Sequence, residues 1–303
     1  MTMDKSHNAP TASVVIRCYN EAEHIGRLLS ELKRQSFTDY EVIVVDSGSD
    51  DGTLDIVRSE DVILEHIRQE DFSFGRSLNV GCGAASGGFL VFISAHCYPE
   101  DEDWLANLIA GFGDDKVAVV YGKQRGIPES HLSEQQIFRR WFPDESIPRQ
   151  EGPFSNNANA AIRRSLWEEF PYDETLTGLE DVAWAQQVMR DGWWVSYRAD
   201  AGVIHVHSET SGQIRNRYRR EAITFQKVFP GEHFNAWDFL RLSTRNVIAD
   251  VRSASGDGGG WMHLWHILRF RVSQFAGTYQ GFHMRRPPSS DLKRRFYYPE
   301  ERE

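Results

Sequence analysis

The first 121 residues alternate short β-branched runs with amphipathic segments, and this order constrains the fold more than any other feature. Alternating strands and helices predict a mostly parallel sheet with helices on both faces. We expect the strands at residues 13–18, 41–45, 62–65, 89–94 and 117–121, and the helices at 22–35, 52–59, 74–86 and 104–112.

Ligands of such sheets bind outside the carboxyl ends of the strands. Polar side chains stand at three of these ends in the sequence. They occur in Cys18-Tyr19-Asn20-Glu21, in Asp46-Ser47-Gly48-Ser49 and in Ser94-Ala95-His96. These segments are therefore the first candidates for a binding site.

The second half of the chain has a less regular pattern. Residues 126–154 are loop-like, helical segments follow residue 230, and glycines interrupt the pattern at 256–260. Since no strand precedes these glycines and no GK[ST] follows them, they predict a flexible connection and not a phosphate loop. We expect a flexible N-terminus at 1–11 and a C-terminal helical region with a tail at 231–303.

Charge and cysteine content narrow the class of protein. The 303 residues carry 34 Lys and Arg against 44 Asp and Glu, a net charge of −10, which argues against nucleic-acid binding. Cys18, Cys82 and Cys97 have no CxxC spacing and predict reduced thiols. No stretch approaches the roughly 18 apolar residues of a membrane span. These features favour a cytoplasmic protein.

Several segments resemble the inverting family 2 glycosyltransferases of the GT-A fold. The resemblance begins with ASVVIRCYNEAEHIGRLLSELKRQSFTDYEVIVVDSGSDDGT and continues in FGRSLNVGCGAASGGFLVFISAHCYP and SNNANAAIRRSLWEEFPYDETLTGLEDVAWAQQVMRDGWWVSYRADAGVIHVH. The motifs follow the family's order over residues 12–230, the expected catalytic domain. The resemblance implies a Rossmann-like α/β/α sandwich with a mostly parallel mixed sheet, followed by a C-terminal helical extension. Bacterial rhamnosyltransferase-like members are the most similar, since Ser94, His96 and Pro99 match their spacing.

The resemblance implies a nucleotide-sugar donor bound at the strand ends. The implied donor-binding positions are Cys18, Asn20, Glu21, Asp46, the turn Ser47-Gly48, Arg76 and Asn79. Each has an alternative structural role. Asp46 could cap the helix beginning near Gly52, Glu21 could be a first-turn acid, and Arg76 and Asn79 could lie on a solvated helix face.

Sugar transfer from a diphosphate requires stabilisation of the leaving group's charge, which a divalent cation supplies in many members. The residue that is the metal-binding carboxylate in Asp-x-Asp members is His96 here. Imidazole suits Mn²⁺ better than Mg²⁺. The family draws a further ligand from His205-Val206-His207, whose alternation puts both rings on one strand face. His205 is favoured and His207 stays open. The alternative is a structural His96 in a metal-independent or inactive enzyme.

A base must accept the proton of the acceptor hydroxyl. Glu180 and Asp181 open an amphipathic helix, and adjacent helical positions point about 100° apart, so only one can face the sugar. The resemblance assigns the base to Asp181 and leaves Glu180 to bind the acceptor or orient the site. An acidic first helical turn is the structural alternative.

Other residues have weaker implied roles. The family's sugar-binding floor matches Asn156, Asn157 and Asn159, ahead of Arg163 and Arg164. Trp184, Trp193 and Trp194 could stack on a sugar or fill the core, with core favoured for Trp194. Arg215, Arg217, Arg219 and Arg220 match a loop that closes over the diphosphate, although part of this run fits a solvated helix face.

The predicted function is transfer of a sugar from a nucleoside-diphosphate donor to a hydroxyl of a saccharide or lipid-linked glycan. The alternative is a catalytically degenerate nucleotide-sugar or glycan-binding protein of the same fold. Residues 261–279 are apolar, aromatic and basic. They could cover the catalytic domain, pack a homodimer, or contact the inner face of a membrane.

Overall fold

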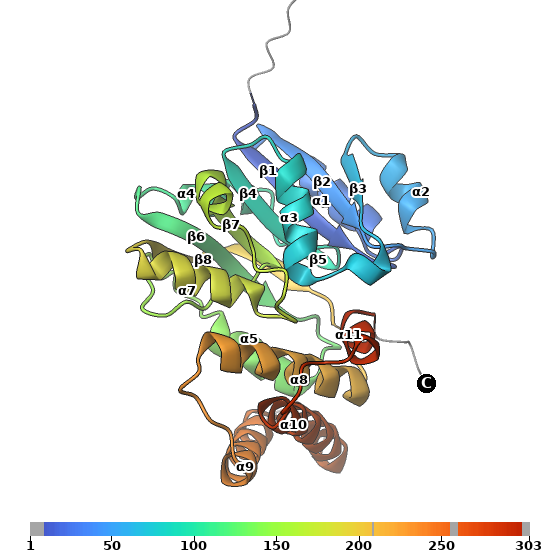
Figure 1. The fold of residues 1–303 in the computed structure, drawn as a ribbon, viewed down its shortest axis with the longest axis vertical. Coiled ribbons are helices and arrows are strands. Elements are labelled where there is room, and N and C mark those ends of the chain that lie inside the picture. Colours follow the sequence, from blue (N-terminus) through green and yellow to red (C-terminus); the bar gives the residue numbers. More distant parts are fainter. Residues whose placement is uncertain (1–8, 208, 255–259, 299–303) are drawn as a thin grey trace, which may run out of the picture.

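The computed structural model describes residues 9–207, 209–254 and 260–298, which form one mixed sheet with helices around it (Figure 1). The strands are β1 (Ala12–Cys18), β2 (Tyr40–Asp46), β3 (Ile63–His66), β4 (Phe89–Ser94), β5 (Cys97–Pro99), β6 (Val117–Arg125), β7 (Asn159–Arg163) and β8 (Trp194–His205). The helices of the sheet domain are α1 (Ile25–Lys33), α2 (Thr53–Arg58), α3 (Phe74–Ala84), α4 (Trp104–Ala110), α5 (Leu132–Trp141), α6 (Arg164–Glu169) and α7 (Glu180–Arg190). Four more helices follow: α8 (Ser211–Val228), α9 (Ala236–Ala254), α10 (Gly260–Phe282) and α11 (Ser290–Tyr297).

The strand order is β3-β2-β1-β4-β7-β6-β8-β5. β1 pairs in parallel with β2 and β4, β2 with β3, and β6 with β8. β7 runs antiparallel to β4 and β6, and β5 runs antiparallel to β8. The register pairs Cys18 with Asp46 and Arg17 with Ser94, so the polar ends of β1, β2 and β4 meet at one edge. The expected mostly parallel mixed sheet is confirmed.

Two apolar layers enclose the sheet, as alternation along a strand requires. On β1, Val14 and Ile16 face the layer that holds α1 and α4, while Val15 faces the layer that holds α3 and α7. Leu28 of α1 and Leu78 of α3 are fully buried on these opposite sides. This is the α/β/α sandwich that the resemblance implies.

Two expectations for the irregular half differ from the structure. Residues 126–154 contain α5 and are not simply a loop. The helix LSEQQIFRRW has only a narrow apolar stripe, with Phe138 buried, so its sequence pattern is weak. The expected break at 256–260 lies outside the described residues except for Gly260, at which α10 begins.

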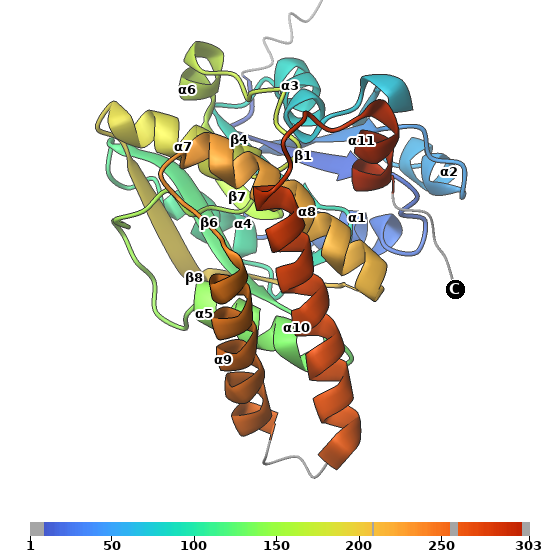
Figure 2. The same cartoon turned by 60° about the horizontal axis from the view of Figure 1, so that its bottom comes forward.

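The helices α9 and α10 form a separate layer at the end of the molecule farthest from β1–β3, whereas α11 packs back on the sheet domain, where the ring of Tyr297 contacts Phe72 and Phe74 (Figures 1 and 2). α10 packs along α8 and α9, so intramolecular packing of the expected apolar segment is confirmed. The α8–α10 contact is close because a Cβ on Gly277 would lie 2.2 Å from the carbonyl oxygen of Arg215. Within the described part of the chain, we find no helix with the length and hydropathy needed to cross a bilayer.

A buried ion pair joins this layer to the sheet domain. Asp250 of α9 accepts hydrogen bonds from both Nε (2.7 Å) and Nη2 (2.8 Å) of Arg271 on α10. The same carboxylate accepts a 2.6 Å bond from the hydroxyl of Ser133 on α5. Because both charged groups are buried and fully paired, they fix the relative position of three helices.

Candidate functional site

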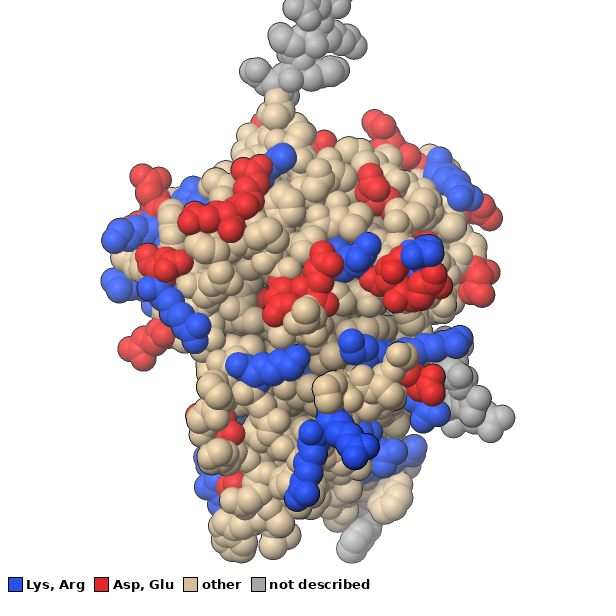
Figure 3. Space-filling view, viewed as in Figure 1, with Lys and Arg blue, Asp and Glu red and all other residues tan. Residues whose placement is uncertain are grey.

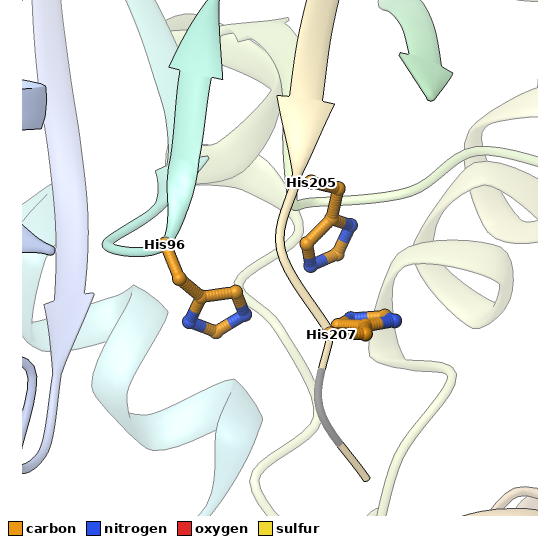
Figure 4. Close-up of side chains that lie close together, drawn as sticks. All are labelled: His96, His205 and His207. Atoms are coloured by element: carbon orange, nitrogen blue, oxygen red, sulfur yellow. The ribbon is translucent and has the colours of Figure 1, made fainter. Parts of the chain in front are cut away.

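Three histidine rings converge where β8 ends beside the turn between β4 and β5 (Figure 4). His96 lies in that turn, His205 is the last residue of β8, and His207 follows two residues later. One ring nitrogen from each lies within 4.8 Å of the other two. The ring centroids of His96 and His205 are 5.1 Å apart, and those of His205 and His207 are 3.9 Å apart.

Backbone pairing brings these segments together. Cys97 pairs with His205 in the β5–β8 ladder, and the amide of Val206 donates a 3.0 Å hydrogen bond to the carbonyl of His96. The sheet itself therefore sets the separation of the rings.

Each ring is oriented through its Nδ1 atom. The partners are Oε1 of Glu21 for His96 (2.7 Å), of Gln124 for His205 (2.8 Å) and of Glu134 for His207 (2.8 Å). Since carboxylate and amide oxygens only accept hydrogen bonds, Nδ1 donates in each ring and the lone pair is left on Nε2. Histidines that bind metals are commonly held in this way by their other ring nitrogen.

The electrostatics keep the central ring neutral. Burial, and then the neighbouring His207 and His96, hold the pKa of His205 well below its ordinary value. Its Nε2 is buried and, among the described residues, has no hydrogen-bond partner. Burial opposes ionisation of Glu134, but His207 and Arg217 outweigh it and lower the pKa of this carboxyl to about 2. His207 thus faces a permanent anion.

These observations fit a divalent cation. A neutral imidazole can bind a cation through its free ring nitrogen. Leaving that buried nitrogen without a partner costs free energy, so a bound cation would remove this cost. Both His205 and His207 reach the cluster, whereas the sequence favoured one of them. An all-imidazole set favours a borderline cation such as Mn²⁺ over Mg²⁺.

The acidic pair lies at the start of α7. The backbone amide of Asn157 donates a 3.1 Å hydrogen bond to Oδ2 of Asp181, while Glu180 is buried and accepts from Arg17 at 3.2 Å. Burial, and then the charge of Glu180, raise the pKa of Asp181 to about 7. The two carboxylates have different partners, as their positions on a helix require.

This pair belongs to the same edge of the sheet. Ala158, next to Asn157, accepts a 3.3 Å hydrogen bond from the amide of Ser94 at the end of β4. Arg17, which holds Glu180, is paired with Ser94 in the β1–β4 ladder. The acids are therefore linked to the turn that carries His96.

A comparison with known proteins shows the family to which the chain belongs. A model of the family described as glycosyl transferase family 2 matches residues 13–170, more than half of the chain. The chain belongs to this family. Its fold is accordingly the GT-A fold, and the expected transferase activity is confirmed at the level of a glycosyltransferase.

Relatives of this glycosyltransferase include two bacterial enzymes. The O-antigen chain rhamnosyltransferase RfbN of Salmonella typhimurium is 28% identical over 68% of this chain and 69% of its own length. The GalNAc(5)-diNAcBac-PP-undecaprenol beta-1,3-glucosyltransferase of Campylobacter jejuni is 23% identical over 69% and 70%. The mannosyltransferase PcManGT from Pyrobaculum calidifontis, solved with GDP-Man and Mn²⁺, has a TM-score of 0.67 at 19% identity, covering 91% of this chain and 88% of its own.

In this glycosyltransferase, Asp46 closes the turn after β2. Its carboxylate accepts hydrogen bonds from the amides of Gly48 (2.8 Å) and Ser49 (3.1 Å) and from the Ser49 hydroxyl (2.5 Å). The alternative that Asp46 caps α2 is wrong, because Asp51 bonds the amide of Thr53 there. The role of Asp46 at the nucleotide base stays a prediction.

Three residues at the end of β1 and just after it have different surroundings. The Cys18 side chain lies in the core and its carbonyl accepts from the Ser47 amide, which joins β1 to β2. Asn20 adopts φ 51° and exchanges two hydrogen bonds with Asp50. Glu21 precedes α1 and holds His96, so it is not a first-turn acid. The predicted nucleotide contacts of these residues remain predictions.

Two predicted binding amides belong to the scaffold. Asn79 donates to the Tyr172 carbonyl and to Glu174 and accepts from the Trp167 indole and the Tyr172 amide, which uses its whole hydrogen-bonding capacity. Asn159 is fully buried and bonds the indole of Trp104 and two backbone carbonyls. Both side chains thus have structural partners, and their predicted ligand contacts stay predictions.

The remaining aromatic and basic residues have mostly structural contacts. Trp184 is buried with its indole donating to the Phe170 carbonyl, which settles its open role in favour of the core. Trp193 and Trp194 pack against the two apolar layers. Arg163 and Arg164 bond backbone carbonyls, such as those of Val117 and Ala85, and not the sugar-binding floor.

The basic run on α8 divides between two tasks. Arg217 pairs with Glu134 at 3.1 Å and with Glu209 at 2.7 Å, so it belongs to the network behind His207. Arg220 donates to the carbonyl of Phe296 and fixes α11. Sequence reasoning missed the part that Gln124 and Glu134 play, because neither lies in a segment that the family resemblance marks.

Proposed function

We propose that this glycosyltransferase moves a sugar, with inversion, from a nucleoside-diphosphate donor to a hydroxyl of a saccharide or lipid-linked glycan. Asp181 is the base, and His96, His205 and His207 hold a divalent cation. The names of the relatives support the substrate class, since they include an O-antigen chain rhamnosyltransferase and an enzyme acting on an undecaprenol-linked glycan. The fold neighbour bound to GDP-Man and Mn²⁺ supports the donor and cation.

One observation carries the proposal: three converging imidazoles, of which His205 is held neutral, and a carboxyl with a raised pKa share one edge of the sheet. The two kinds of group meet two needs of one reaction. The imidazoles would bind the cation that stabilises the leaving diphosphate, and the carboxyl would accept the proton of the attacking hydroxyl. A purely structural cluster has no need of both.

The base role follows from the environment of Asp181. With a pKa of about 7, its carboxyl is largely ionised just above neutral pH and is more basic than an ordinary aspartate. The Asn157 amide donates to Oδ2 at 3.1 Å and the Val182 amide donates to Oδ1 at 2.8 Å, so the orientation of the carboxylate is fixed. Glu180, paired with Arg17, helps to raise the pKa of Asp181, and its proposed role is to orient the acceptor.

In the proposed cation site, three residues bind the cation and three others orient them. His96, His205 and His207 are the ligands, and Glu21, Gln124 and Glu134 orient them. When bound, a divalent cation supplies Lewis-acid stabilisation of the charge on the diphosphate. The nucleotide occupies the ends of β1 and β2, with Asp46 and its turn at the base and Asn20 and Cys18 beside it. Residues 12–230 form the catalytic unit.

The substitution Asp181→Asn tests the assignment of the base. It should lower nucleoside-diphosphate release from a panel of nucleotide sugars by about 10²–10⁴-fold, while calorimetry shows unchanged nucleotide binding. Asp55→Asn, on the exposed surface of α2, is the matched control and should leave both quantities unchanged. Parallel loss of binding and turnover in Asp181→Asn would place Asp181 in the donor pocket and overturn the assignment.

A further inference from the structure

The outer face of α9 is apolar and basic along its whole length. Its exposed residues recur every three or four positions and line one shallow groove: Trp237, Leu240, Arg241, Thr244, Arg245, Ile248, Ala249 and Arg252. Trp237 is 67% exposed and Leu240 is 56% exposed, although residues of this kind are usually buried. Neighbouring α10 exposes Trp265 as well, at 64%.

None of the residues that line this groove is acidic. Of the two acids of α9, Asp238 pairs with Arg241 of the groove near the first turn, while Asp250 is buried against Arg271. Arg245 and Arg252 are exposed, and neither forms an ion pair with an acid among the described residues. The face is thus a row of large apolar side chains flanked by cations.

The charge of this region is opposite to that of the rest of the chain. Residues 236–282, which include α9 and α10, contain five Lys and Arg against three Asp and Glu, a net +2, whereas the remaining residues contain 29 against 41, a net −12. On the face drawn in Figure 3, acidic side chains gather over the sheet domain, and Lys and Arg predominate over the helices below it. The end formed by α9 and α10 therefore carries a small positive charge on an otherwise acidic molecule.

We propose that the α9 face docks on an anionic lipid surface. A helix with apolar side chains in line and Arg beside them lies in the interface plane, with its apolar atoms among the acyl chains and its charges at the headgroups. Trp is favoured at that depth. The acidic sheet domain then points away from the lipid, where like-charge repulsion is least.

A second copy of this chain is a poorer occupant of the face. A two-fold contact places the same patch on both partners, so the arginines of one copy would meet those of the other. An anionic surface instead complements every charge on the face. The inference does not depend on the catalytic assignment, because it rests on the exposed residues of α9 and not on the histidines or on Asp181.

Co-sedimentation of the full chain with vesicles tests the proposal. We expect binding to vesicles of phosphatidylcholine mixed with phosphatidylglycerol, weak binding to phosphatidylcholine alone, and loss of binding in high salt. The triple variant Arg241→Gln, Arg245→Gln, Arg252→Gln should bind on the order of 100-fold more weakly, about 1 kcal/mol for each charge.

A matched control removes the same number of charges from the opposite end of the molecule. The triple variant Lys33→Gln, Arg34→Gln, Arg58→Gln alters residues that are similarly exposed on α1 and α2 and in the α1 C-cap, and should bind vesicles like the parent protein. Circular dichroism checks that each variant is folded. Equal binding by the α9 variant and the parent would overturn the proposal. So would gel filtration showing that the α9 variant has lost a dimer while vesicles bind neither protein.

Discussion

The pH dependence of turnover tests the proposed base role of Asp181 more closely than the substitution Asp181→Asn does. Its pKa rises from the usual 3.8 to about 7, mainly through burial and then through the charge of Glu180. That difference corresponds to about 4 kcal/mol of destabilisation of the carboxylate. Because a base must be ionised, donor hydrolysis should reach about one tenth of its plateau near pH 6 and about nine tenths near pH 8.

Two neighbouring substitutions should move this profile in opposite directions. Glu180→Gln removes a charge that raises the pKa of Asp181, so the acid limb should shift to lower pH by about one pH unit. Arg17→Gln removes a charge that lowers the same pKa, so the limb should shift to higher pH. Release of nucleoside diphosphate is measured at saturating Mn²⁺ at every pH, so that metal loss does not imitate the limb. A flat profile, or a shift of Glu180→Gln to higher pH, would refute the reasoning.

The remaining predictions concern the cation site and the packing of the helices. Glu134→Gln should weaken Mn²⁺ binding by about 10–100-fold because His207 loses its anionic partner; an unchanged titration would contradict this. Gly277→Ala should cost about 1–3 kcal/mol in urea unfolding, since its Cβ would press on the Arg215 carbonyl, whereas Gly83→Ala, with open space around it, should be neutral or stabilising. Asp250→Ala should cost about 3–5 kcal/mol, because a buried guanidinium loses its partner; a cost below that of an ordinary surface change would show that the ion pair is not structural.

The same carboxyl links activity to stability. A raised folded-state pKa contributes stability that is present below pH 3.8 and is lost as the pH rises through about 7, because the native state must then bury an anion. Asp181→Asn removes that cost. Its melting temperature should exceed that of the parent near pH 8 and approach it near pH 5, as measured by differential scanning fluorimetry. A lower melting temperature at both values would mean that the carboxylate has a structural role.

The sequence predicted the first half of the fold well because its signals are local. Each strand of the parallel part is a continuous apolar run, and each helix has an apolar stripe, so β1, β2 and β4 were found within a residue or two. α5 was missed because its polar sequence buries few apolar residues. The three-residue β5 carries no pattern of its own and exists only through its ladder with β8.

The candidate site was predicted only in its innermost residues. Motif spacing pointed to His96 and His205, but the partners that orient them lie 75 and 81 residues away and leave no local signal. Asn79 and Asn159 show that an amide in a family motif can have structural partners that the motif does not reveal. Burial and saturation of hydrogen bonds reveal these partners, and both require the folded chain.

Binding of Mn²⁺ followed by electron paramagnetic resonance, in the presence of a nucleoside diphosphate, tests the central claim most directly. The parent protein should bind one tight Mn²⁺ that Mg²⁺ displaces poorly, and His96→Ala, His205→Ala and His207→Ala should each weaken that binding markedly while circular dichroism shows a folded protein. Mn²⁺ binding that is unchanged in all three variants would show that the imidazoles do not hold the cation, and the proposed mechanism would fail with it.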